Sequence, residues 1–250
     1  MLLCTALALT SLVACSSQGR ADARSASPSP AVPASVSATG SPAPSTDPLT
    51  TPSAAPVEAR SALRAAPLRA APQPPAVVRR GTGVLAVVPG ASAVAGTGRP
   101  TRYLVEVEGG LGVDPRAFAR EVERVLGDRR SWGAGGRRAM QRVSGGTVAF
   151  RVALASPRTT DRLCSPLRTN GYYSCANSGR AVLNLARWVT GAPSYAGRLT
   201  EYRQYLVNHE VGHTLGRGHE RCPGPGRPAP VMLQQTKGLA GCARNSWPYP

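Results

Sequence analysis

The segment from His209 to His219 carries residues whose types and spacing could hold a metal ion and use it. It reads H-E-x-x-H-x-x-G-x-x-H, and its three histidines are all the histidines of the 250-residue chain. Histidines four positions apart lie on one side of a helix, so His209 and His213 can reach one metal from consecutive turns. The pattern therefore predicts a site for one Zn²⁺ ion.

Two further residues of the motif have expected roles. Gly216 can adopt positive φ, which would end the helix and return His219 as the third ligand. Three imidazoles leave the fourth zinc position open for water. Glu210 projects beside the ligands, and we expect it to act as the general base that takes a proton from this water and passes it to a leaving amine. The expected reaction is hydrolysis of a peptide bond in a protein or peptide substrate.

Other interpretations of these residues remain open. The site could be a structural or vestigial zinc site in a cell-envelope binding protein, or the histidines could serve packing or lie on the surface. Cys222 follows His219 by three residues and could itself bind zinc. We favour the three histidines because, together with water, they already complete a catalytic zinc site.

The same segment resembles the metzincin clan of zinc peptidases, in which a methionine turn beneath the metal follows the long zinc motif. The run Ala229-Pro230-Val231-Met232 supplies a matching methionine, 13 residues after His219. The alternative for Met232 is a flexible side chain that fills a gap in the core. Gln234 stands where astacin-like relatives have a tyrosine, so the resemblance predicts no tyrosine ligand here.

Further stretches are similar to an actinobacterial family of exported zincin-like domains, and the similarity covers roughly residues 85–250. The resemblance implies an α+β, zincin-like fold. A small mixed β-sheet would pack on helices that include the active-site helix, and a short C-terminal subdomain would carry His219 and the Met-turn. The stretches that carry the similarity are Asn184-Leu185-Ala186-Arg187-Trp188, Tyr202-Arg203, Asn208-His209-Glu210, the Ala-Pro-Val-Met run and Trp247-Pro248-Tyr249-Pro250.

Local patterns predict the elements that would position the motif. Alternating apolar residues indicate strands, and Asp114-Pro115 supplies an N-cap and a first-turn proline for a helix. The helix that carries the motif should start near Arg198-Leu199-Thr200 and stop at Gly216. The other expected elements are strands over 102–108, 147–155 and 181–185, and a helix from 114 to about 126.

The N-terminal part of the chain has the composition of an export signal and a linker. Residues 2–14 are apolar but too short to span a bilayer, and Leu12-Val13-Ala14-Cys15 resembles a bacterial lipobox. We expect a lipoprotein-type signal peptide over 1–15 with lipidation at Cys15, although no Lys or Arg precedes the apolar run; ordinary secretion is the alternative. Residues 16–80 are rich in Pro, Ala and Ser and predict a disordered linker. Residues 81–250 are the predicted globular domain.

Four cysteines lie in that domain: Cys164, Cys175, Cys222 and Cys242. An even number of cysteines in an exported protein favours two disulfides over free thiols. Three pairings are possible. We favour Cys164 with Cys175 and Cys222 with Cys242, because each of these pairs brackets a loop that contains Gly or Pro.

The chain is strongly basic, with a formal charge of +17, of which +4 lies in the first 80 residues. Its cations are arginines except for Lys237, which suggests a coding bias as much as a function. The functional alternative is contact with anionic cell-wall polymers. No basic helix or zinc-finger spacing accompanies the charge, so we expect no nucleic acid partner. We expect a monomer at the outer face of the cell membrane or in the cell wall, where peptidoglycan cross-link peptides are a further candidate substrate.

Overall fold

The structure is a computed structural model, and it describes residues 76–250. The predicted signal peptide, the lipidation at Cys15 and nearly all of the predicted linker lie outside the described residues. Val77 and Val78 pack against the hydrophobic core, so the packed domain includes residues before 81. Within the part of the chain that is described, no helix has the length and apolar character needed to cross a membrane.

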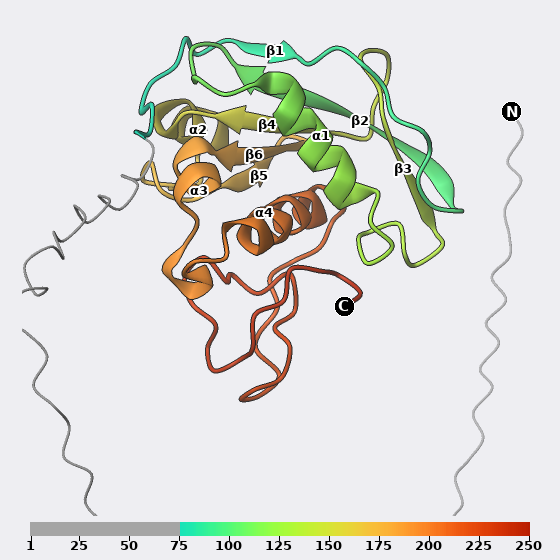
Figure 1. The fold of residues 1–250 in the computed structure, drawn as a ribbon, viewed down its shortest axis with the longest axis vertical. Coiled ribbons are helices and arrows are strands. Elements are labelled where there is room, and N and C mark those ends of the chain that lie inside the picture. The colour runs from blue at the N-terminus through green and yellow to red at the C-terminus, as the bar shows by residue number, and fades with distance from the viewer. Residues whose placement is uncertain (1–75) are drawn as a thin grey trace, which may run out of the picture. The chain divides into compact units, whose positions relative to one another are not determined.

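The domain contains six strands, four α-helices and one 3-10 helix within residues 76–250. It combines a mixed β-sheet with helices, as expected for an α+β fold. Figure 1 shows α4 below the sheet and the last segment of the chain beyond α4. The elements are β1 (Leu85–Val87), β2 (Arg99–Glu108), α1 (Pro115–Leu126), β3 (Arg138–Arg142), β4 (Phe150–Ala155), α2 (Pro157–Cys164), β5 (Cys175–Asn177), β6 (Arg180–Asn184), α3 (Leu185–Thr190), the 3-10 helix η1 (Pro193–Tyr195) and α4 (Leu199–Thr214).

The sheet has the order β1-β2-β4-β6-β5, and β3 also pairs with β2. Strands β2, β3, β4 and β6 run parallel, whereas β1 and β5 are antiparallel to their neighbours. Because β3 pairs with residues 99–103 and β1 with residues 106–108, the two strands share one edge of β2. Because β2, β3, β4 and β6 run in the same direction, all four strands begin toward the same end of the sheet.

Alternate residues of β6 face two separate cores. Ala181 and Leu183 belong to the large core cluster, which also contains residues of α1, α3 and α4. Val182 belongs to a smaller cluster with Cys164 and Cys175, which lie at the end of α2 and the start of β5. Side chains of a strand point alternately to its two faces, so the large cluster and the smaller one lie on opposite faces of the sheet.

Helix signals in the sequence were more reliable than strand limits. Asp114 caps α1 as predicted, because its side chain accepts a hydrogen bond from the backbone N of Arg116. The strand predicted over 147–155 begins only at Phe150, where its register with Tyr103 of β2 starts. Leu185, predicted as a strand residue, starts α3, whose N-cap is the side chain of Asn184.

Both predicted disulfides are present. Cys164 pairs with Cys175, with 6.0 Å between their Cα atoms, and Cys222 pairs with Cys242, with 5.8 Å between theirs. A bridged sulfur is not available as a thiolate ligand, so the alternative in which Cys222 binds zinc is wrong in this structure. Two disulfides fit an extracellular or secreted protein.

Glu108, at the end of β2, joins three segments through its buried carboxylate. Its oxygens accept hydrogen bonds from the backbone N of Gly83 at 2.8 Å, the backbone N of Ser156 at 2.6 Å and the hydroxyl of Thr159 at 2.8 Å. Burial by itself would raise the pKa of Glu108, but these hydrogen bonds together hold the pKa below its usual value. The charged carboxylate therefore stabilises the junction of β2 with the start of α2.

We expect Glu108→Gln to lower the free energy of unfolding by about 1–3 kcal/mol at neutral pH, because the amide NH₂ would face a backbone donor. The folded pKa lies below the ordinary value of 4.5, so the stabilisation is complete above that value and is lost as the pH falls through the folded pKa. Denaturant unfolding across this range should show the difference between wild type and variant shrinking with acid. Glu121→Gln, which breaks a surface ion pair with Arg124, is the control; an equal loss there would contradict the prediction.

Candidate metal centre

Helix α4 carries the motif through the middle of the domain. Residues 205–212 are all buried, so the helix is enclosed by the domain up to the first turn of the motif. Asn208, which is fully buried, accepts a hydrogen bond from the Ser131 hydroxyl at 2.7 Å and donates one to the carbonyl of Ser246 at 2.9 Å. Its backbone carbonyl accepts a third hydrogen bond from the indole N–H of Trp132. These bonds restrain the rotation of the helix about its axis and its position along that axis, just before His209.

Helix α4 ends at Thr214, two residues before the predicted stop at Gly216. Gly216 follows the C-cap and has φ +84°, in the region that favours glycine. The backbone N of Gly216 donates to the carbonyl of His213, and the backbone N of Arg217 donates to the carbonyl of Gly212. These two bonds form a Schellman motif, which stops a helix and reverses the chain direction. The turn carries His219 back toward the helix.

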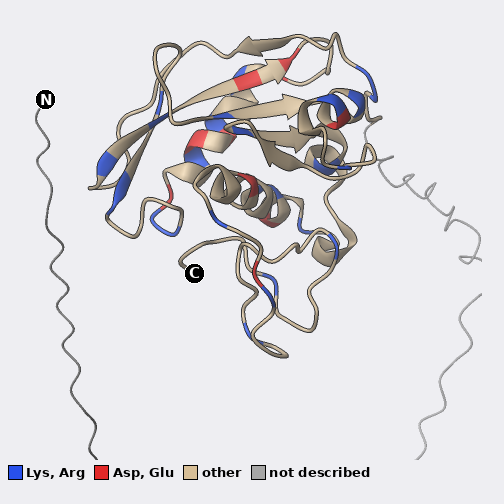
Figure 2. Cartoon of the chain, turned by 180° about the vertical axis from the view of Figure 1, so that it is seen from behind, with Lys and Arg blue, Asp and Glu red and all other residues tan. Residues whose placement is uncertain are grey.

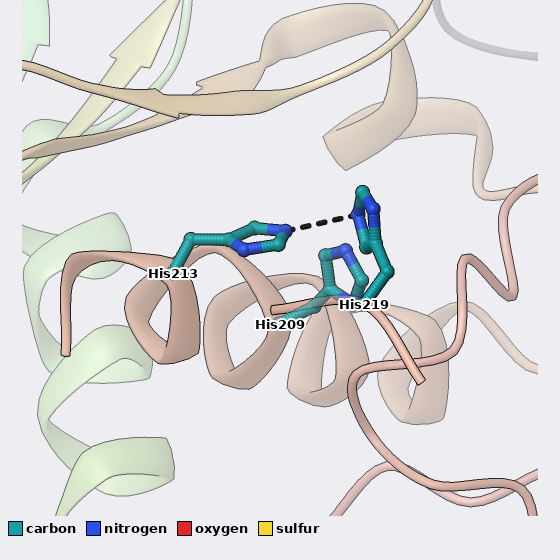
Figure 3. Close-up of side chains that lie close together, drawn as sticks. All are labelled: His209, His213 and His219. Atoms are coloured by element: carbon teal, nitrogen blue, oxygen red, sulfur yellow. Dashed lines mark hydrogen bonds between the residues drawn. The ribbon is translucent and has the colours of Figure 1, made fainter. Parts of the chain in front are cut away.

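The three imidazoles converge over α4, two from the helix and one from the segment that follows it (Figure 3). One ligand atom from each of His209, His213 and His219 lies within 4.8 Å of the others. The Nε2 atoms of His213 and His219 are 3.1 Å apart. His209 is buried, His213 is partly buried and His219 is exposed, so the cluster opens to solvent on the side of His219.

Hydrogen bonds set the ring form of two of these histidines. Nδ1 of His209 is 2.8 Å from the carbonyl of Val231, and Nδ1 of His213 is 2.8 Å from the carbonyl of Arg217. A carbonyl can only accept, so each Nδ1 carries the proton and each Nε2 keeps a free lone pair. Burial, which outweighs the Val231 hydrogen bond, lowers the pKa of His209 to about 3. Burial, and the repulsion that a protonated His213 would exert, lower the pKa of His219 as well, so the neutral, ligating form is favoured.

The cluster fits a zinc ion by chemistry and by size. Neutral imidazole nitrogens are common zinc ligands, and in a tetrahedral site with Zn–N of about 2.0–2.1 Å they lie about 3.3 Å apart. The His213–His219 separation of 3.1 Å is close to this value. In the absence of a metal, the His219 Nε2–H can donate a hydrogen bond to the lone pair of His213 Nε2 across the same gap. His209, His213 and His219 are therefore the residues that would hold the metal.

Glu210 lies in the same cleft, which has a volume of about 780 Å³. It is the only acidic residue among the described residues that line this cleft, and the three histidines line it too. Glu210 is 5% exposed, and burial raises its pKa to about 8. A carboxylate with a raised pKa beside an open cleft has the proton affinity of a general base.

Met232 lies against the motif helix. It is 1% exposed, and its backbone carbonyl accepts a hydrogen bond from the backbone N of Glu220. A Cβ atom built on Gly212 would overlap Met232 Sδ and lie 2.7 Å from Cζ2 of Trp132. Gly212 therefore lets the sulfur and the indole ring approach the helix backbone within the histidine motif.

The family DUF3152, described as a protein of unknown function, matches residues 71–250, well over half of the chain. The chain belongs to the DUF3152 family. No curated protein and no solved structure matches it. The match begins close to the first described residue, so the DUF3152 region includes the sheet, the histidine cluster and the C-terminal segment.

A buried glutamine, Gln235, holds the C-terminal segment of the DUF3152 domain in place. Gln235 is fully buried; it accepts a hydrogen bond from the Tyr195 hydroxyl at 2.9 Å and donates one to the Asn245 carbonyl at 2.7 Å. Its neighbour Gln234 lines the cleft and accepts a hydrogen bond from Lys237. The position two residues after the methionine thus places an amide on the wall of the cleft, and the bonds of Gln235 fix the adjoining backbone.

Sequence reasoning missed the supporting residues of the DUF3152 site. Asn208 was noticed only as part of a resemblance, and Gly212 and Trp132 were not singled out. Gly212 carried a detectable signal, because a glycine in the middle of a helix weakens it unless close packing requires the missing side chain. Trp132 had no local signal, because it lies 80 residues before Gly212 and only folding brings the two together.

We expect Gly212→Ala to lower the free energy of unfolding by about 1–3 kcal/mol, because the added methyl group overpacks the contact with Met232 and Trp132. This corresponds to a fall in Tm of about 3–10 °C for a domain of this size. Thermal unfolding of the full chain measures it. Gly218→Ala is the matched control, since its Cβ would meet nothing within 4 Å; an equal fall in both variants would show that the packing argument is wrong.

Proposed function

We propose that this DUF3152 protein is an exported, zinc-dependent endopeptidase. The observation that carries the proposal is the convergence of His209, His213 and His219 to within 4.8 Å beside the buried carboxylate of Glu210. A purely structural zinc site would need neither a base nor an open cleft next to the ligands. The cleft of about 780 Å³ leaves room for a polypeptide segment.

The chain's own groups supply the rest of the reaction. Bound zinc would act as a Lewis acid on the peptide carbonyl and on the attacking water. Glu210 would accept a proton from that water and return it to the leaving amine, which balances the hydrolysis of the amide bond. The carbonyls of Val231 and Arg217 would keep the rings of His209 and His213 in the same orientation during both proton transfers.

The finer fold assignment belongs to the same proposal. The histidine helix, the reversal at Gly216 and the buried Met232 support a zincin-like domain with a metzincin Met-turn. The disulfides support export, and Cys15, which lies outside the described residues, is the proposed lipid anchor. A lipid-anchored enzyme would meet protein or peptide substrates outside the cell membrane.

Metal analysis combined with cleavage of a broad peptide library tests the proposal. The full chain should bind one zinc ion and cleave internal peptide bonds. A chelator should remove both the metal and the activity, and added zinc should restore them. A protein that binds one zinc but leaves the whole library uncleaved would instead be a binding protein with a structural site, and a protein that binds none would remove the metal centre altogether.

A further inference from the structure

Four arginines surround a second cleft, at the end of the sheet where the parallel strands begin. Arg99 and Arg102 lie in the first part of β2, Arg138 is the first residue of β3, and Arg137 precedes it. The cleft has a volume of about 900 Å³, and no acidic residue is among the described residues that line it. Figure 2 shows the basic colour at the projecting ends of these two strands. The cleft therefore has a strongly positive wall.

These four charges have no partner within residues 76–250. The ion pairs of the described residues use other arginines, and none of the four side chains makes a hydrogen bond there. Arg99 and Arg138 are direct register partners on neighbouring strands. Like charges placed side by side on a sheet destabilise it. An anion between the two strands would offset this repulsion, which gives the arrangement a functional explanation.

The arginine cleft adjoins the histidine cleft. Thr214, one residue after His213, lines both of them. The starts of the strands connect the two clefts. Gly179, which lines the histidine cleft, accepts a backbone hydrogen bond from Arg151 of β4. Ala149, which lines the arginine cleft just before β4, donates one to the backbone carbonyl of Arg102. An extended chain that crosses the three histidines would therefore continue past Thr214 into the arginines.

We propose that the arginine cleft binds an acidic segment of the polypeptide substrate, on the Thr214 side of the cleaved bond. This inference rests on the proposed peptidase function and adds a preference for Asp and Glu several residues from that bond. Guanidinium groups bind carboxylates through paired hydrogen bonds in a fixed geometry, which suits them to this role. The continuity of the two clefts favours a substrate chain over a separate wall polymer.

Binding of fluorescein-labelled hexaglutamate to the full chain, followed by fluorescence polarisation at low salt, tests the site without requiring activity. We expect R99Q/R138Q to weaken binding by about tenfold, since it removes two of the four charges. The control R116Q/R158Q removes two exposed arginines from α1 and α2. These helices follow the C-terminal ends of β2 and β4, whereas the arginine cleft lies at the N-terminal ends of the strands. Binding in that control should change less than about twofold. Equal weakening in both variants would overturn the proposal, since it would show that net charge alone attracts the probe.

Two further arms separate the alternatives. If a polyphosphate of equal charge displaces the probe at lower concentration than unlabelled hexaglutamate does, the cleft belongs to a phosphate polymer and the proposal is overturned. For a cleaved substrate, kcat/KM should fall about tenfold in R99Q/R138Q when the flanking residues are Glu and stay unchanged when they are Gln. Loss of probe binding in R99Q/R138Q without any cleavage by wild type would uphold the acidic-peptide site and refute the peptidase function.

Discussion

Replacing Glu210 by Gln is expected to lower kcat/KM for peptide cleavage by about 10²–10⁴-fold, the usual contribution of a general acid–base residue. Gln has the size of Glu but cannot accept the proton. Burial raises the pKa of Glu210 to about 8 and so favours its neutral form; a neutral amide of the same size should therefore fit the site and retain the fold. Because Glu210 is not one of the ligands, one zinc ion per chain should remain bound.

Steady-state cleavage of a peptide found in the library screen, with zinc content measured on the same samples, checks this result. Glu201→Gln is the matched control, because Glu201 lies on the same helix and only forms an ion pair with Arg198 at its start. Its activity should stay within about twofold of wild type, as expected for a surface ion pair. If the Glu210 variant keeps its activity while binding zinc, Glu210 is not the base.

Replacing His219 by Ala is expected to weaken zinc binding at least about 100-fold, because it removes one of three protein ligands and even the partners of ligands contribute 10–100-fold. His219 is exposed and follows the end of α4, so its removal should leave the thermal stability of the metal-free protein unchanged. Competition between the protein and a chromophoric chelator measures the affinity, and peptide cleavage should be lost at limiting zinc.

Two variants near His219 serve as comparisons for this prediction. Glu220→Ala changes the exposed neighbour of His219 and should leave zinc affinity intact. Gly216→Ala adds a methyl group that meets nothing within 4 Å but sits at φ +84°, which costs about 1–2 kcal/mol of backbone strain. We expect it to weaken zinc binding by about tenfold or less, because the strained turn is the one that returns His219 to the cluster. If His219→Ala binds zinc as tightly as Glu220→Ala, His219 is no ligand.

The sequence by itself determined the parts of this protein that depend on local spacing. Histidines four apart must share a helix face, Gly216 must end the helix, and the pairing of Cys222 with Cys242 closes a short loop. Asp114 followed by proline likewise predicted the start of α1 correctly. In each case, one turn or one short loop contains all the atoms that decide the outcome, so residue type and separation were sufficient.

Only the tertiary structure decided which distant residues meet. The sequence showed a basic composition, but the parallel pairing of β2 with β3 set Arg99 beside Arg138 and opened a cleft next to His213. It showed a glycine within the motif, but the fold placed Met232 and Trp132 against it. Such contacts join residues tens of positions apart, and they depend on strand order and packing, which residue spacing along the chain does not encode.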